Sequence, residues 1–119
     1  MTAGGVFAPI NASNGYMNGV YRYPYDGKLK KYKRHPDSHK LISGLKIPLW
    51  EDIAQLAIEL HKNVPFMPIC GWDMILSGRD IYVQELNYNP NIYAGQIIGP
   101  LLLNPQVKEF YNYYIKKVR

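Results

Sequence analysis

The chain has 119 residues, of which 47% are hydrophobic and 19% charged. This composition excludes a disordered tail, and the length is typical of one domain of about 100–150 residues, so we expect a single domain over residues 1–119. No apolar run approaches the roughly 18 residues of a membrane span, and the one cysteine, Cys70, excludes an intramolecular disulfide. We therefore expect a cytoplasmic protein that makes no use of a membrane.

The net charge of +5 comes from one short segment. Five cations and no anion lie within residues 28–34, and the rest of the chain has equal numbers of basic and acidic residues. Tyr32 interrupts the cations, which is compatible with a strip that contacts phosphate or nucleic acid. The same pattern is also typical of an edge strand that lysines protect from aggregation. The segment alone leaves both interpretations open.

The first half of the chain predicts short antiparallel strands. Apolar and aromatic runs place them at residues 6–10, 20–25 and 28–32. Asp26-Gly27 is a strong signal for a two-residue hairpin turn between the second and third strands. Residues 35–46 are polar and contain Pro36 and Gly44, so we expect an ordered loop there.

The second half predicts two helices and a second hairpin. One helix is expected from Pro48 to about Lys62, with a buried apolar stripe formed by Ile53, Leu56, Ala57 and Leu60. Strands are expected at residues 68–76 and 80–87, and a last helix begins after Asn104 as its N-cap. The pattern as a whole predicts an α+β fold, an antiparallel sheet with two packed helices.

Three polar side chains interrupt the apolar strands of the second hairpin. Asp73 lies in the first strand, and Glu85 and Asn87, two residues apart, share a face of the second and continue the face of Ile81 and Val83. Carboxylate and amide oxygens are the ligands that Mg²⁺ prefers, and magnesium usually leaves other positions to water and substrate phosphates. The spacing favours a metal site, although each residue alone is more typical of a solvent-facing or turn position.

The register of this hairpin tests the metal site. A two-residue loop at Gly78-Arg79 in a regular ladder would set Asp73 against Gln84 and put Glu85 on the opposite face. A three-residue loop, or an equivalent bulge, sets Asp73 directly against Glu85. We therefore predict the longer loop or the bulge.

At this point the sequence resembles a known family. Gly71-Trp72-Asp73 followed by Glu85-x-Asn87 resembles the metal-bearing strands of ATP-grasp enzymes, in particular those associated with sugar transfer and polysaccharide biosynthesis. Further segments support the resemblance, which runs from about Gly4 to Asn91: Asn14-Gly15, His35-Pro36-Asp37, Ile47-Pro48 and Trp50-Glu51. The resemblance covers the C-terminal half of such an enzyme, and we expect the N-terminal half to be absent.

The resemblance implies that Asp73, Glu85 and Asn87 hold Mg²⁺ against the phosphates of ATP. In this fold the γ-phosphoryl group usually passes to a carboxylate, which makes the expected activity that of an ATP-dependent carboxylate ligase. Its ligands would be ATP and a carboxylate or sugar-linked substrate. A separate chain that supplies the missing half, or a second copy, is the expected partner, and the isolated chain should have little activity.

Four residues are further candidates for the cofactor site. The charge pattern suggests that Lys30 and Lys31 face the phosphates or an anionic acceptor, and the polar loop places His35 and Asp37 where they could contact substrate. The alternative for His35 is a loop histidine satisfied by the backbone. Cys70 is interpreted as a small apolar residue, because no histidine is near it in the sequence.

Two other functions stay open at this stage. The first is a binding module for nucleic acid or an acidic polymer, built on the basic strand with Tyr32. The second is a structural remnant that self-associates. Magnesium-dependent nucleotide binding that needs Asp73 and Glu85 would separate an enzyme fragment from both alternatives.

Overall fold

The computed structural model describes residues 5–22, 29–92, 95–96 and 99–118, which form an α+β fold. They fall into two compact units, Met1–Asn89 and Pro90–Arg119, and each is described by itself. The expected organisation as one domain over residues 1–119 stays a prediction. Within the described ranges, no helix is both long enough and apolar enough to cross a membrane.

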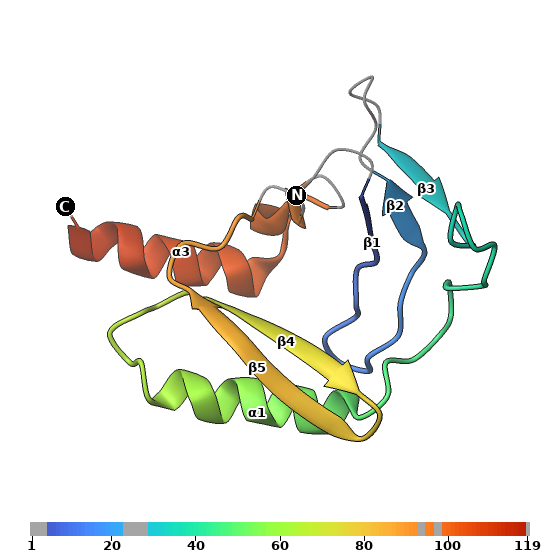
Figure 1. The fold of residues 1–119 in the computed structure, drawn as a ribbon. Coiled ribbons are helices and arrows are strands. Elements are labelled where there is room, and N and C mark those ends of the chain that lie inside the picture. The colour runs from blue at the N-terminus through green and yellow to red at the C-terminus, as the bar shows by residue number, and fades with distance from the viewer. Residues whose placement is uncertain (1–4, 23–28, 93–94, 97–98, 119) are drawn as a thin grey trace. The chain divides into compact units, whose positions relative to one another are not determined.

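The first unit begins with a three-stranded antiparallel sheet in the order β1-β2-β3 (Figure 1). Its strands are β1 (Val6–Phe7), β2 (Val20–Arg22) and β3 (Lys30–Tyr32). The pairing of β2 with β3 confirms the first hairpin, whereas its Asp26-Gly27 turn lies outside the described residues. β1 is shorter than predicted because Pro9 has no N–H to donate to a ladder. The chain pairs again only at Ile10, which bridges Met17.

A tight contact joins this sheet to the first helix. Gly15 is buried at φ 77°, and a Cβ at this position would lie 2.4 Å from the Trp50 side chain. The Trp50 indole Nε1 donates to the Ala12 carbonyl at 3.0 Å. Only glycine fits both the left-handed backbone and the packed indole, so the start of the helix is held on the loop before β2.

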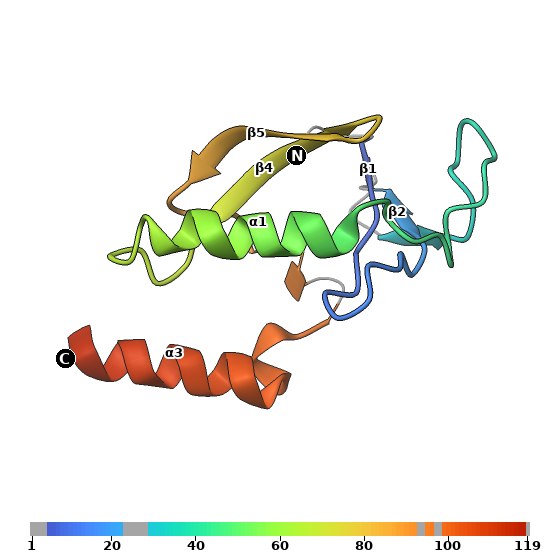
Figure 2. The ribbon, with the colours of Figure 1, turned by 90° about the horizontal axis from the view of Figure 1, so that it is seen from below.

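The first unit ends with a helix and a two-stranded hairpin. α1 (Trp50–Lys62) lies along one face of the antiparallel pair β4 (Gly71–Ser77) and β5 (Asp80–Asn87), as two views show (Figure 1, Figure 2). These bounds agree with the predicted helix and strands to within a few residues. The stripe predicted to be buried, however, is only half-buried, and α1 has no buried residue. A sheet of two strands is too narrow to cover the whole apolar face of a helix.

The interior of the described structure is small. Among the described hydrophobic residues only Val20, at 2% exposure, is buried. Several large apolar side chains of the first unit are exposed, including Ile75 at 50% and Tyr82 at 55% on the hairpin. Folding by itself therefore leaves apolar surface on β4 and β5 open to a ligand or a partner.

The second unit consists of the short 3₁₀ helix η1 (Leu101–Leu103) and α3 (Pro105–Val118). Asn104 is the predicted N-cap: its Oδ1 accepts from the backbone N–H groups of Gln106 at 3.0 Å and Val107 at 3.3 Å. Phe110 packs against Tyr114 with ring centroids 4.7 Å apart, on the apolar face that the sequence predicts. This unit carries none of the predicted site residues.

Candidate functional site

The register of β4 and β5 sets Asp73 directly opposite Glu85. The loop is the two-residue Gly78-Arg79 turn, with Ser77 paired to Asp80, so the predicted three-residue loop is wrong. Gly78 at φ 63° gives the backbone the left-handed turn that a tight loop needs. The predicted alternative is confirmed, because the register shifts between Asp73 and Met74 through a β-bulge.

The bulge is located at Gln84. Val83 pairs with Met74 and Glu85 pairs with Asp73, which leaves Gln84 as the additional residue of β5. A bulge of this kind bends the strand and redirects side chains, and is common beside functional sites. Here it brings two carboxylates to one side of the hairpin.

Asn87 completes the group. Its Nδ2 donates to Asp73 Oδ2 at 3.3 Å and to Glu85 Oε1 at 3.1 Å. Asp73 and Glu85 are exposed, and Asn87 is half-buried where β5 ends opposite Gly71. The three side chains that the sequence singles out therefore converge at one point, and a single amide links both carboxylates.

The face that carries these three side chains also has an apolar part. Ile75 pairs with Tyr82, and Ile75 lies two residues after Asp73, on the same side of β4. The sequence predicted that Glu85 continues the face of Ile81 and Val83; the bulge overturns this, because Glu85 follows Tyr82 instead. The site face thus combines two carboxylates and an amide with exposed apolar surface.

The donor chemistry of this group fits a hard divalent cation. Two carboxylates that face each other across a hairpin repel, and a cation between them removes that repulsion. Rotation of the Asn87 side chain by 180° exchanges its Nδ2 and Oδ1 atoms and turns an oxygen toward the carboxylates. In the described part of the chain, no cluster of three or more His, Cys, Asp or Glu could hold a metal, so the amide would be a necessary member.

Lys30 and Lys31 do not act as a pair. They are neighbours on β3, where successive side chains point to opposite faces of the sheet. The Lys31 ammonium lies 5.6 Å from the centre of the Tyr21 ring and 3.5 Å from Asn18 Oδ1. At most one of the two lysines can therefore face a given ligand.

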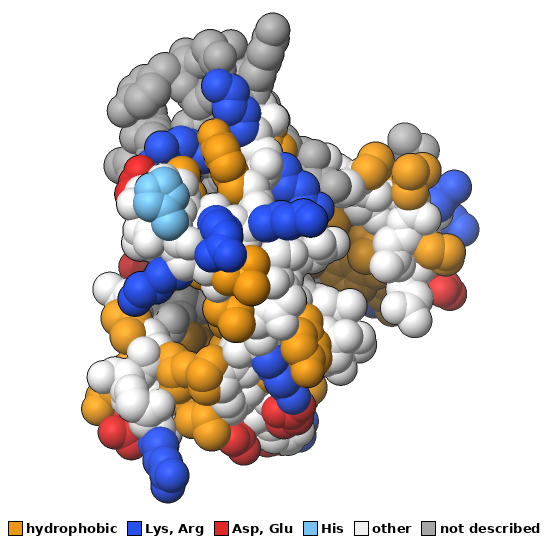
Figure 3. Space-filling view, turned by 90° about the vertical axis from the view of Figure 1, so that its right-hand side faces the viewer, with side chains coloured by type: hydrophobic (Ala, Val, Ile, Leu, Met, Phe, Trp, Pro, Cys, Tyr) orange, Lys and Arg blue, Asp and Glu red, His pale blue; other side chains and the backbone are white. Residues whose placement is uncertain are grey.

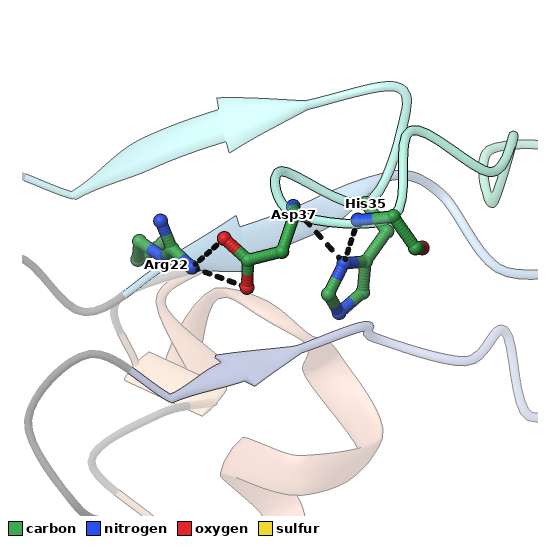
Figure 4. Close-up of polar contacts among 4 residues, drawn as sticks. Arg22, His35 and Asp37 are labelled. Carbon is green, nitrogen blue, oxygen red and sulfur yellow. Dashed lines mark hydrogen bonds and ion pairs between the residues drawn. The ribbon is translucent and has the colours of Figure 1, made fainter.

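His35 and Asp37 belong to an internal network of the loop after β3 (Figure 4). The Arg22 Nη2 donates to both carboxylate oxygens of Asp37 at 2.7 Å, and this hydrogen bond, with the charge of Arg22, lowers the pKa of Asp37. His35 Nδ1 accepts from the backbone N–H groups of Asp37 and Ser38, both at 3.2 Å. Asp37 is thus occupied by an ion pair, whereas the hydrogen bonds of His35 to other described residues involve only its Nδ1 atom.

Cys70 has a partner that the sequence did not indicate. The His61 Nδ1 lies 3.1 Å from Cys70 Sγ, and both residues are half-buried. Although no histidine is near Cys70 in the sequence, His61 is therefore beside it in space. Nine positions separate the two residues, and the turn after α1 closes that gap. Sequence spacing carries no signal for such a contact.

Comparison with known protein families identifies one family that matches this chain. The family described as sugar-transfer associated ATP-grasp matches residues 1–112 of this chain. The chain belongs to this family. No curated protein and no solved structure matches it.

Membership in the sugar-transfer associated ATP-grasp family agrees with the α+β architecture of two antiparallel sheets and two helices. The matched region includes both sheets, α1 and most of α3. The matched region also includes Asp73, Glu85 and Asn87, the three residues that the hairpin brings together.

Proposed function

We propose that this sugar-transfer associated ATP-grasp domain binds Mg-ATP, with Asp73, Glu85 and Asn87 as the ligands of the metal. The observation that carries the proposal is the bulge-corrected register, which sets the two carboxylates opposite each other with Asn87 in hydrogen-bond contact with both. Among the described residues, no basic side chain pairs with these two exposed carboxylates. Like charges opposite one another destabilise a hairpin, so the pair does not add to the stability of the fold.

The same face offers a surface for the rest of the nucleotide. Ile75 and Tyr82 are exposed and lie beside the carboxylates, so a planar base can bury apolar area there while its phosphates approach the metal. When bound, Mg²⁺ supplies positive charge against the phosphates. Asp73 and Glu85 would bind the ion, and the Asn87 amide oxygen would complete its set of protein ligands. The reaction that we propose is transfer of the γ-phosphoryl group of ATP to a carboxylate of a sugar-linked substrate.

The small interior supports a further part of this proposal. Val20 is the only buried hydrophobic residue in the described part of the chain, and the face that carries the proposed site is exposed. An enzyme that transfers a phosphoryl group must exclude water from its active site, so this face needs a further covering. A second body, either another part of an ATP-grasp fold or a second copy of this chain, would cover Ile75 and Tyr82. We expect the chain to bind Mg-ATP weakly alone and to lack ligase activity until that face is covered.

Calorimetric titration of the purified chain with ATP, with and without Mg²⁺, tests the nucleotide proposal. Binding should require Mg²⁺ and should be lost in Asp73→Asn and in Glu85→Gln. Asp80→Asn is the matched control, because Asp80 is on the same hairpin, opposite Ser77 and away from Asn87. Binding that persists in both site variants, or that falls equally in the control, would contradict the proposal. So would salt-dependent binding of RNA or DNA with no response to nucleotide.

A further inference from the structure

A second candidate site lies away from the carboxylates, in the loop that follows β3. A solvent-open depression of about 380 Å³, called the cavity below, is lined by Tyr32, Lys33, Arg34, His35, Pro36 and His39. This volume lies within the usual range for small-molecule sites, roughly 300–1,000 Å³. The function proposed above uses none of these residues, although the sequence had suggested that His35 belongs to the cofactor site.

Backbone hydrogen bonds build the cavity. Arg34 bridges Leu41, and the N–H of His35 donates to the Lys40 carbonyl at 2.8 Å. The N–H of His39 donates to the His35 carbonyl at 2.9 Å, which closes the turn on itself. His39 has φ 57°, an uncommon value for a residue other than glycine, which such contacts must maintain. The wall is thus an ordered loop, as the sequence predicted.

The lining is basic. Lys33, Arg34 and two histidines contribute to it, and none of its six residues is acidic. Asp37 is the only acidic residue between residues 29 and 46, and its charge is taken up by Arg22 at 2.7 Å. Figure 3 shows Lys and Arg side chains gathered on the face of the molecule that carries β3 and this loop. An anion that enters the cavity therefore meets positive charge, and no carboxylate is among the described residues that line it.

The hydrogen bonds of His35 leave its Nε2–H as a possible donor to a ligand. Its Nδ1 accepts two backbone N–H groups, so in the neutral ring the proton must be on Nε2. The Arg34 Nη1 donates to the His39 carbonyl at 3.0 Å, which holds the guanidinium at the cavity while its other N–H groups stay available to a ligand. Tyr32 and Pro36 add apolar wall beside these donors.

We propose that this cavity binds a phosphorylated sugar, with the phosphate on the Lys33, Arg34 and His35 donors and the sugar ring against Tyr32 and Pro36. Lysine and arginine recognise phosphate oxygens by charge and by N–H donation, and aromatic and proline surfaces contact the C–H faces of a sugar. The choice of a sugar rests in part on the function proposed above, whereas the phosphate contact does not. The ligand would be a second substrate, bound independently of the nucleotide.

Titration of the whole chain with glucose 1-phosphate, glucose and inorganic phosphate, without Mg²⁺ or ATP, tests this proposal. The sugar phosphate should bind more tightly than phosphate alone, and glucose should not bind measurably. His35→Asn is the main variant, because the Asn side-chain oxygen can still accept the backbone N–H two residues on while the Nε2 donor is lost. Affinity should fall about tenfold, as expected for one hydrogen bond to a charged group.

Controls separate this site from its surroundings. Lys33→Gln should weaken binding by a similar factor, whereas Lys40→Gln, on the same loop but outside the lining, should leave it unchanged. Equal affinity for phosphate and glucose 1-phosphate would overturn the sugar part of the proposal. Equal effects of Lys33→Gln and Lys40→Gln, or no binding at all, would overturn it entirely. Asp73→Asn should bind the sugar phosphate as the native chain does, because Asp73 does not line the cavity. A failure of the nucleotide proposal can therefore be told apart from a failure of the sugar-phosphate proposal.

Discussion

Asp73 lies opposite Glu85 because β5 contains one residue more than β4 needs, Gln84. The Asn87 amide touches both carboxylates, at 3.3 and 3.1 Å. This relationship is costly without a cation, since it gathers two negative charges on one face of a narrow hairpin. Under the proposed function a bound cation would offset this repulsion, and the consequences can be measured.

Removal of one carboxylate should stabilise the chain when no divalent cation is present. Asp73→Asn relieves a like-charge pair, worth about 0.2–1 kcal/mol for residues directly opposite on a sheet. Thermal unfolding in EDTA should show a higher midpoint for the variant than for the native chain. In millimolar Mg²⁺ the order should reverse, because only the native chain gains stability from the metal. A variant less stable under both conditions would contradict this prediction.

Deletion of Gln84 should preserve the site. Without it, β5 pairs with β4 as a regular ladder from the Gly78-Arg79 turn, and the glutamate still meets Asp73. The Mg²⁺ response in thermal unfolding should therefore persist. Deletion of Leu86 is the control, since it makes Glu85 and Asn87 direct neighbours and turns them to opposite faces. If both deletions abolish the Mg²⁺ response in thermal unfolding equally, the position of Gln84 does not determine whether the two carboxylates are aligned.

The Arg22–Asp37 ion pair should produce an acid-sensitive contribution to stability. Its hydrogen bonds lower the pKa of Asp37 below the ordinary value of 3.8, so the contribution is present above that pH. It is lost as the pH falls through the lowered pKa. Asp37→Asn should reduce the unfolding temperature slightly at neutral pH and not at all well below pH 3.8. Both partners are partly exposed, so high salt should shrink the difference at neutral pH. If the native chain and Asp37→Asn differ in unfolding temperature by the same amount at both pH values, the ion pair does not make the predicted contribution.

Two glycines with similar backbones should respond differently to alanine. Gly15 and Gly44 have φ values of 77° and 86°, but only Gly15 faces a neighbour, the Trp50 side chain. Gly44→Ala should cost about 1–2 kcal/mol for the left-handed conformation alone. Gly15→Ala should cost a further 1–3 kcal/mol, roughly, because the indole must move. If denaturant titrations give the same loss in the free energy of unfolding for both variants, the contact with Trp50 does not affect stability.

The His61–Cys70 contact should appear as an energetic coupling. A double-mutant cycle with His61→Ala and Cys70→Ala should give a coupling of about 0.5–1.5 kcal/mol, the net value of one hydrogen bond. Ile58→Ala, at an exposed position of the same helix, is the reference and should combine additively with Cys70→Ala. Additivity in both cycles would mean that the 3.1 Å approach contributes nothing to stability.

Much of the local structure follows from the sequence because its signals are local. Asn104 before a proline predicts an N-cap, and acidic and basic residues at the two ends of residues 50–62 match the helix dipole. Asp73, Glu85 and Asn87 are noticeable because carboxylates and amides are rare in apolar strands. Their types and spacing were enough to predict that they meet, given one loop or one bulge.

Only the tertiary structure decided how they meet. Residue counting allows a longer loop or a bulge, and the choice depends on twist and packing across the whole hairpin rather than on any single residue. The same limit applies to His61 with Cys70 and to Arg22 with Asp37, contacts between residues that chain folding brings together. The amino-acid order determined which chemical groups this protein has and which short elements carry them. Their partners and the faces they share were set by long-range packing, which no local pattern encodes.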